Sequence, residues 1–515
     1  MDTLLPILTT ALPLLPLLTG LVVLVFGRRT AGQISGKAAL LTAALAGMAA
    51  IGMMIYGPVT VRWPIPGGLR ASALALRLDA ISSVMIVVVA GLGAAVLRFS
   101  RHYLAGDLAE KRFYILMNLT LASVLTLVLA GNILLLFGAW VTTSLCLHRL
   151  LLLYPNRAGA VFSARKKFLF SRVGDVCLLA ATILLYRNYG TGDFSELFAA
   201  IGAGKVEGLP TVACLLAACA ALKSAQFPFH SWLPDTMETP TPVSAFMHAG
   251  IINAGGFLLI RFSPVLVQAP LALNLLAVIG ALTAAFGAIV MLTQPSVKRA
   301  LAYSTIAQMG FMLLQCGMGA FGLALLHLAA HSLYKAHAFL RSGSTVGSIP
   351  RAAIPLRTPA LTLGLLSGAL VVTGVTTALT FFLPRYAFDP DVFTLILGFA
   401  IAYGLARAWS AGGRWNLILR SVWGSLGIVA ASLAVHAGGQ LLLHTLPVIG
   451  LSPGVLVFIA VIFTGLFFFQ GLLWRASHFA IGQRLYVYAL NGFYIGTLAN
   501  RALGRFWPRH LITPL

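Results

Sequence analysis

The sequence predicts an all-α, polytopic membrane protein with about 15 transmembrane helices. Apolar residues make up 59% of the 515-residue chain and charged residues only 9%, too few for a water-exposed surface. Apolar runs of about 20 residues recur along the chain, and each can cross a hydrocarbon core as a helix. Short loops between these runs carry most of the basic residues, which is typical of membrane topology.

The expected helices follow one another with short connections. The first run has no basic leader and no small-residue cleavage site, which indicates a retained helix rather than a signal peptide. The less apolar tail, about 478–508, carries arginines among aromatic residues and predicts either an amphipathic interfacial helix or a last helix packed on the bundle. The runs are 4–26, 38–57, 78–98, 113–131, 132–153, 166–186, 209–231, 241–262, 272–293, 300–318, 320–341, 359–383, 391–410, 416–436 and 447–475.

The net charge of +23 sets topology rather than binding nucleic acid, because no soluble basic domain is present. An outward N-terminus places the basic clusters in alternate, cytoplasmic loops, and the C-terminus then lies in the cytoplasm. The loop at 58–77 is an exception. The clusters are Arg28/Arg29/Lys37, Arg98/Arg101/Lys111/Arg112, Arg157/Arg165/Lys166/Lys167, Lys298/Arg299, Arg341/Arg351/Arg357 and Arg407/Arg414/Arg420.

The cysteines favour structural thiols over a metal site or a cofactor. All five lie inside apolar runs, without CxxC spacing and without clustered histidines. We expect no cofactor. The cysteines are Cys146, Cys177, Cys214, Cys219 and Cys316.

Lys223 is the first candidate for ion transfer. It ends an almost wholly apolar stretch and precedes Pro228, which removes a backbone donor and predicts a broken helix. An ionised group in hydrocarbon costs at least about 2.5–3.5 kcal/mol, so it needs a partner, a water-filled cavity or loss of its proton. The alternative is a lysine that reaches the interface or pairs permanently with an acid such as Asp175.

Histidines continue this pattern in later helices. His248 lies about two turns into the apolar run after a Pro/Thr turn, where the ordinary explanation is a histidine bonded to a carbonyl. His327, His331 and Lys335 recur at i, i+4 and i+8 and therefore share one helix face over about 12 Å. Imidazole accepts and donates protons, so this face predicts a hydrated proton relay.

Two further observations bear on the predicted proton relay. His-x-x-x-His is also a zinc spacing, but no HExxH glutamate and no third ligand lie nearby, so we expect no metal. Lys298, followed by Arg299, is either a loop residue that sets topology or a member of the relay.

Two long strings resemble the antiporter-like subunits of complex I, subunit L most of all, and of Mrp cation antiporters. They read Lys-Ser-Ala-Gln-Phe-Pro-Phe-His-Ser-Trp-Leu-Pro-Asp-Thr-Met-Glu-Thr-Pro-Thr-Pro-Val-Ser-Ala-Phe-Met-His at 223–248 and Val-Lys-Arg-Ala-Leu-Ala-Tyr-Ser-Thr-Ile-Ala-Gln-Met-Gly at 297–310. The resemblance runs from about 75 to 345. It implies two inverted five-helix repeats, each with a broken helix, in which Lys223 is the central carrier of the first. It also divides the chain into N-terminal helices (1–112), an antiporter-like core (113–410) and C-terminal helices with an amphipathic tail (411–515).

The sequence also departs from the pattern of the antiporter-like family. The family places a glutamate after a tryptophan to pair with the carrier lysine, whereas Val141 follows Trp140 here. Asp175 is then the nearest candidate counter-charge. The second repeat lacks a Gly-Phe-x-Ser-Lys string, and no long lateral helix follows.

These losses, with Ser144-Leu-x-Leu-His148 and the tail that begins at Asn491-Gly-Phe-Tyr, look similar to DabB subunits of dissolved-inorganic-carbon accumulation complexes. The resemblance implies a zinc-containing, carbonic-anhydrase-like DabA partner. It also implies an ion-conducting coupling subunit of the bacterial inner membrane that energises carbon uptake and is not itself an enzyme.

Two other functions compete with this hypothesis. A proton-pumping subunit of a respiratory NADH dehydrogenase or an Mrp-type antiporter would share the strings, but Val141 and the lysine-free C-terminal third disfavour it. A structural anchor that has lost conduction would explain the absent glutamate.

Overall fold

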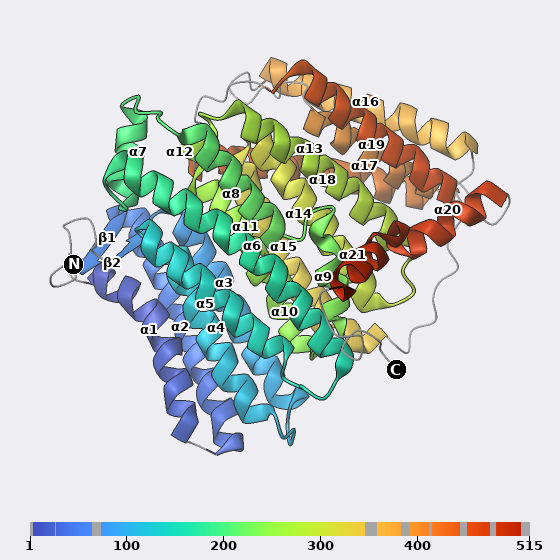
Figure 1. The fold of residues 1–515 in the computed structure, drawn as a ribbon. Helices are drawn as coiled ribbons and strands as arrows, with labels where there is room; N and C mark the ends of the chain where they lie inside the picture. The colour runs from blue at the N-terminus through green and yellow to red at the C-terminus, as the bar shows by residue number, and fades with distance from the viewer. Residues whose placement is uncertain are drawn as a thin grey trace.

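The computed structural model describes residues 4–25, 27–63, 74–345, 358–382, 392–410, 415–442, 451–473 and 480–505, and the fold in these ranges is almost entirely helical (Figure 1). The predicted all-α class is confirmed. The N-terminal helices are α1 (Leu4–Val25), α2 (Arg28–Tyr56), α3 (Ala80–Tyr103), α4 (Glu110–Leu129), α5 (Ile133–Leu151), α6 (Ala158–Tyr189) and α7 (Phe194–Gly202). The central ones are α8 (Leu209–Lys223), α9 (Trp232–Asp235), α10 (Thr241–Ala249), α11 (Ala254–Arg261), α12 (Ser263–Leu266), α13 (Pro270–Thr293), α14 (Val297–Gly317) and α15 (Phe321–Leu340). The C-terminal ones are α16 (Thr358–Phe382), α17 (Val392–Ser410), α18 (Trp415–Leu442), α19 (Pro453–Leu473), α20 (Ala480–Leu490) and α21 (Ile495–Gly504).

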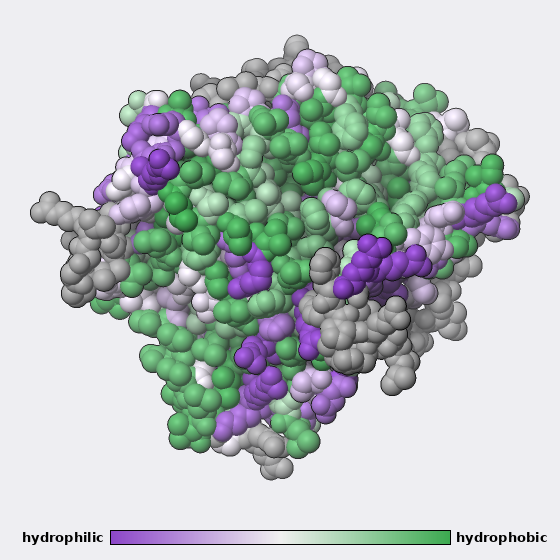
Figure 2. Space-filling model, in the orientation of Figure 1, coloured by the Kyte–Doolittle hydropathy of each residue, from purple (hydrophilic) through white to green (hydrophobic). Residues whose placement is uncertain are grey.

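The protein is a multi-pass membrane protein. Within the described ranges, 11 spans are long and apolar enough to cross a membrane, and α8, α14, α15 and α16 pack in the same bundle. Large apolar side chains face outward. The surface in Figure 2 is mostly hydrophobic, with hydrophilic patches near α7, near α20 and α21, and in the middle and lower part of the view. The inverted relation of two five-helix repeats and the three-part division of the chain stay predictions.

Three helix boundaries differ by eight residues or more from the predicted runs. α2 begins at Arg28 rather than at 38, so Arg28, Arg29 and Lys37 lie in a helix and their assignment to a loop is wrong. α6 begins at Ala158 rather than near 166, so Lys166 and Lys167 lie inside a helix and are buried. Their assignment to an exposed basic loop is therefore wrong. α8 ends at Lys223 rather than near 231, because Ala225 adopts a left-handed φ of 51° just after the last turn.

The predicted helix break is confirmed. Between α8 and α10 the chain forms only the short elements η1 (Phe229–Ser231), α9 and η2 (Thr236–Glu238). The next span is interrupted as well, since η3 (Ile251–Asn253) separates α10 from α11. Two neighbouring membrane segments thus carry irregular backbone, which is tolerated at membrane depth only where protein or water covers it.

A β-hairpin, which the sequence analysis did not predict, closes one side of the bundle, here called the hairpin side. Strand β1 (Val59–Trp63) pairs antiparallel with β2 (Leu74–Leu78), with Val61 opposite Leu76. The alternation of apolar and polar residues in Val59–Trp63 is typical of a strand, whereas Leu74–Leu78 has Arg77 as its one polar residue.

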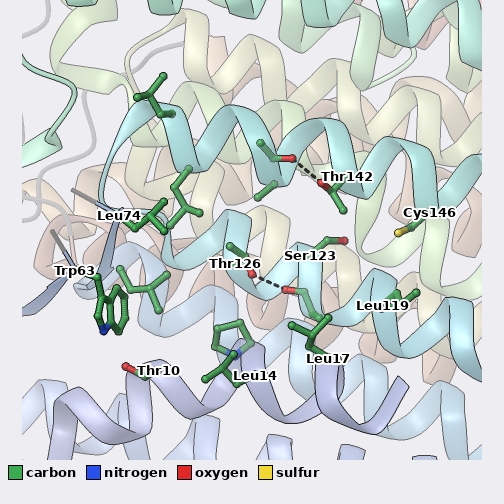
Figure 3. Close-up of a pocket in the computed structure, with 17 residues that line it drawn as sticks. Thr10, Leu14, Leu17, Trp63, Leu74, Leu119, Ser123, Thr126, Thr142 and Cys146 are labelled. Carbon is green, nitrogen blue, oxygen red and sulfur yellow. Dashed lines mark hydrogen bonds between the residues drawn. The ribbon is translucent and has the colours of Figure 1, made fainter. Parts of the chain in front are cut away.

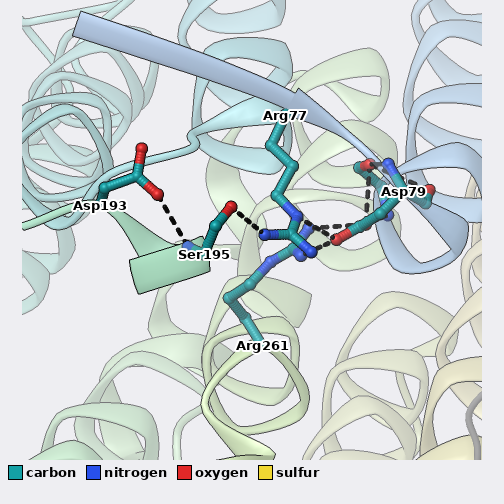
Figure 4. Close-up of polar contacts among 6 residues, drawn as sticks. Arg77, Asp79, Asp193, Ser195 and Arg261 are labelled. Atoms are coloured by element: carbon teal, nitrogen blue, oxygen red, sulfur yellow. Dashed lines mark hydrogen bonds and ion pairs between the residues drawn. The ribbon is translucent and has the colours of Figure 1, made fainter. Parts of the chain in front are cut away.

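Ion pairs fasten this hairpin to three helices (Figure 4). Arg261 at the end of α11 contacts both carboxylate oxygens of Asp79, at 2.5 and 3.2 Å, and Arg77 of β2 contacts the same carboxylate at 3.0 Å. Asp79 also caps α3. Arg77 donates to Ser195 of α7, so the network joins α3, α7, α11 and the hairpin.

The opposite side of the bundle, called the basic-loop side, is tied by contacts between loops and helix ends. Lys111 donates to the carbonyl of Leu24, and Tyr154 donates to Asp107 at 2.6 Å. The tail reaches this side, where α20 packs on α13 and α19 while α21 packs on η1. Residues 478–479 and 506–508 of the predicted amphipathic tail lie outside the described residues.

Candidate functional site

Lys223 lies at the break, buried, with its ammonium over an aromatic face. Its side chain belongs to the last residue of α8 and is 6% exposed. The Nζ atom lies 4.4 Å from the centroid of the Trp140 ring on α5, a cation–π contact worth about 2 kcal/mol when removed from water. Nζ has no hydrogen-bond partner among the described residues.

Trp140 connects this lysine to the predicted counter-charge. Its Nε1 donates to Oδ1 of Asp175 at 3.0 Å, while its ring face carries the ammonium of Lys223. Oδ2 of Asp175 lies 2.6 Å from Nη2 of Arg172, one turn earlier on α6. The carboxylate is therefore near Lys223 but directed to an arginine and an indole.

The sequence analysis missed a second buried lysine beside this group. Lys167 donates from Nζ to both the carbonyl and the hydroxyl of Ser144, each at 2.8 Å, and it is only 2% exposed. Arg172 reaches the same hydroxyl at 3.3 Å. Ser144 lies three residues after Val141, so a neutral hydroxyl occupies the neighbourhood of the missing glutamate. The signal was present, because two lysines in the first turns of a long apolar run are costly unless satisfied.

His248 lies in the second interrupted span. Its Nδ1 is 3.1 Å from the hydroxyl of Thr305 on α14, and its ring stacks on Phe339 with centroids 4.4 Å apart. The Nε2 atom has no partner in the described part of the chain. A hydroxyl rather than a carbonyl therefore holds this histidine, and one ring nitrogen remains open.

The three residues of the predicted relay face, His327, His331 and Lys335, all lie on α15, but their side chains make different contacts. The ring nitrogens of His327 contact the side-chain oxygens of Gln315 and Gln308 at 2.8 and 2.9 Å, so this imidazole is fixed. His331 is 4% exposed, and neither of its ring nitrogens has a partner in the described ranges. Lys335 is fully buried and donates to the carbonyl of Leu301 at 3.2 Å.

Lys298 lies beside the end of this line rather than within it. It is partly exposed in the first turn of α14, one turn before Leu301, whose carbonyl accepts from Lys335. The structure thus groups Lys223 with Asp175 in the first half, and His327, His331 and Lys335 in the second, with His248 on α10 packed against α15.

A cavity of about 780 Å³ lies on the other face of α5 (Figure 3). Gly138, Thr142 and Cys146 of α5 line it, together with residues of α1 and α4. Two residues along a helix turn the side chain by about 200°, so these residues point away from Trp140 and Ser144. The cavity is mostly apolar and separate from the buried charges.

The described residues contain no group of three or more His, Cys, Asp or Glu that could hold a metal ion. What the arrangement offers is proton chemistry: buried lysines, unpaired imidazole nitrogens and two breaks in neighbouring spans. These features define a membrane transport subunit of the broken-helix class.

Comparison with known proteins agrees with this class. Residues 130–383 match the family described as NADH:quinone oxidoreductase/Mrp antiporter, TM. Residues 63–114 match the N-terminus of complex I chain 5.

Three curated relatives are similar over much of their length. A probable inorganic carbon transporter subunit DabB2 of Halothiobacillus neapolitanus is 37% identical over 86% of this chain and 82% of its own. A probable DabB of Hydrogenovibrio crunogenus is 44% identical over 56% of this chain and 58% of its own. NADH-quinone oxidoreductase subunit L of Mycobacterium tuberculosis is 36% identical over 66% of this chain and 55% of its own.

Among solved structures, the Mrp complex from a Dietzia species superposes with a TM-score of 0.62 and 25% identity, covering 99% of this chain and 58% of that one. Respiratory complex I from Thermus thermophilus gives 0.58 and 23% over 95% and 99%, which is a likeness of fold. The chain belongs to the antiporter-like family of complex I subunit L and Mrp antiporters, within its DabB group of inorganic carbon transporter subunits.

Proposed function

We propose that the chain conducts protons and thereby energises the uptake of CO2 or bicarbonate by a partner subunit. The observation that carries the proposal is Lys223, a buried lysine at a helix break whose ammonium has no hydrogen-bond partner in the described residues. The charged form of Lys223 is stabilised by the indole face of Trp140 and by the carboxylate of Asp175, which already pairs with Arg172. Such a group suits repeated gain and loss of a proton.

The relay would run from Lys223 through His248 to His331 and Lys335. Within the described residues, His248 has one open ring nitrogen, opposite the nitrogen that contacts Thr305, and His331 has two, so each ring can accept a proton on one side and release one on the other. The fixed ring of His327 would orient its neighbour, since the two rings lie 6.4 Å apart, edge to face. Water is needed to connect these groups, and the two breaks provide the irregular backbone that accommodates it.

The partner we propose is a DabA-like, zinc-containing subunit, with the chain in the bacterial inner membrane, its N-terminus outside and its C-terminus in the cytoplasm. The relatives' names support this assignment, since they designate transporter subunits of inorganic carbon. Conversion of carbon would then take place on the partner, and this chain would supply the ion gradient's energy.

Growth tests the proposal. The chain is expressed with and without its DabA-like genomic neighbour in a carbonic-anhydrase-deficient bacterial host and scored in ambient air. Growth that requires both proteins supports the coupling role. Failure to restore growth, together with co-purification of redox subunits, would support a respiratory NADH dehydrogenase subunit instead.

His331→Ala is expected to reduce uptake by about tenfold, because it removes the one buried imidazole of the line with both nitrogens open. Carbon-dependent growth and the amount of protein in the membrane are the measurements. His337→Ala is the control, since that histidine is exposed on the same helix. Uptake at the wild-type rate in His331→Ala would remove this residue from the path.

Asp175→Asn is expected to impair transport nearly as much as Lys223→Ala. The side-chain amide of the variant carries no negative charge at the indole N–H of Trp140, and it leaves Arg172 without an ionic partner. Uptake in assembled complexes is the measurement, with Asp107→Asn on the basic-loop side as the control. Near-normal transport would show that Lys223 works without this carboxylate.

A further inference from the structure

The C-terminal tail lies directly over the helix break that carries Lys223. In Figure 1 the red helix α21 runs beside α9, at the basic-loop side of the bundle. The carbonyl of Leu490 accepts from Gln294 at 3.0 Å, and a Cβ built on Gly496 would lie 3.7 Å from Cβ of Ser231. The tail thus contacts segments that lie almost 200 residues or more before it in the sequence.

Beneath the tail lies a buried histidine that the proposed relay does not use. His230 is 1% exposed, and its Nδ1 has no partner among the described residues. Its ring stacks on Phe227 and lies 4.5 Å from the ring of Phe286. Phe493 of the tail covers Phe286 in turn, with centroids 6.0 Å apart. The tail therefore completes an aromatic lid over the residues that follow Lys223.

A buried lysine anchors the tail's far end. Lys166, whose side chain is fully buried, donates to Asp235 of α9 at 2.8 Å and to the side-chain oxygen of Asn500 at 2.6 Å. Asn500 is the uncharged side chain among the three, and it belongs to the tail. The side-chain oxygen of Asn500 on α21 thus accepts from the same ammonium of α6 that pairs with Asp235 in the break.

The bend of the tail is conformationally unfavourable. Phe493 and Tyr494, between α20 and α21, have φ values of 52° and 59°, a left-handed backbone that residues with a Cβ avoid. Gly492, just before them, lies against Tyr303, where a Cβ would come within 3.0 Å of the hydroxyl. Contacts to the bundle, rather than local preference, hold this bend.

We propose that residues 490–500 are a movable cover on the basic-loop end of the ion path to Lys223, with Asn500 as the residue that positions it. The cover excludes water from His230 and the break while Lys166 holds Asn500. Displacement of α21 releases the bend and opens the break to water. This inference rests on the proposed conduction through Lys223.

A reversible crosslink tests the cover. The double variant Ser231→Cys/Gly496→Cys places two Cβ atoms about 3.7 Å apart, within the range of a disulfide. Ion flux is measured in membrane vesicles that contain the whole complex, before and after oxidation and again after reduction. We expect at least a tenfold loss on oxidation, full recovery on reduction, and no redox response in either single-cysteine variant.

Each result of the crosslinking experiment either supports or contradicts the movable cover. A crosslinked protein that conducts at the rate of its reduced form would show that the tail is a fixed wall and overturn the inference. Failure of the pair to crosslink in the membrane would contradict the contact itself. Lys223→Ala in the same assay separates the two proposals: if that variant conducts normally, the proposed path is wrong, whatever the crosslink does.

Discussion

Lys223→Ala is expected to reduce carbon-dependent ion flux by about 100-fold or to background, the scale of losing a group that carries a proton in each cycle. The methyl group cannot bind a proton, and it removes the charge from the face of Trp140. Growth in air of a carbonic-anhydrase-deficient host and ion flux in membrane vesicles are the measurements. Assembly is checked by co-purification with the partner, because loss of a buried contact can also reduce the amount of complex.

The matched control is Lys37→Ala, which removes an exposed lysine from α2. It should leave flux and growth unchanged, because the total charge falls equally while the break is intact. A Lys223→Ala complex that assembles and still supports growth would contradict conduction through this residue. A complex that assembles and is inactive would exclude a purely structural anchor.

Arg261→Ala is expected to lower the free energy of unfolding by about 3–5 kcal/mol, the usual cost of breaking a buried pair from one side. Arg261 is 2% exposed and contacts both oxygens of Asp79, which caps α3. Its loss leaves the carboxylate of Asp79 with Arg77 as its remaining ionic partner, beside the capping bonds from Ser82. Thermal unfolding in detergent is the measurement.

Arg62→Ala is the control on the same side of the bundle. Arg62 pairs with Asp193 at 2.9 Å but is 48% exposed, so its loss should cost only about 0–1 kcal/mol. Equal losses for the two variants would show that burial does not distinguish these pairs.

The ion pair between Asp79 and Arg261 predicts that the stability of the protein declines at low pH. Burial raises the pKa of Asp79, but the charge and hydrogen bonds of Arg261 outweigh it and hold the pKa below its usual value. The folded state therefore binds fewer protons, and the stabilisation is complete above about pH 4, the pKa of an unfolded aspartate. It declines as the pH falls below that value, and Asp79→Asn should lack this decline.

Much of the fold could be read from the sequence because the membrane imposes simple rules. Length and apolarity located the spans, and Pro228 located the break. The hairpin was not predicted because its strands are only five residues long and only the first alternates apolar and polar residues. Lys166 and Lys167 were assigned to a loop because a basic pair next to an apolar run usually sets topology.

The sequence predicted most ionisable residues of the candidate site, with Lys167 as the exception, but it did not predict the contacts that join them. Asp175 was found by elimination, whereas its link to Lys223 passes through Trp140, whose role depends on ring orientation. Likewise, the sequence pattern treats His327 and His331 alike. In the structure they differ, because Gln308 and Gln315 of another helix hydrogen-bond only His327. Such contacts depend on helix packing, which one sequence does not specify.

The placement of Trp140 also gives the protein an internal optical probe. Its indole has an ammonium against the ring and a carboxylate at the N–H, so the local electric field acts on the ring's excited state. A change in the charge of Lys223 alters that field. The emission wavelength of this tryptophan, isolated by replacing the other seven, should therefore shift when Lys223 gains or loses a proton, so it would report directly on the proposed role of this lysine.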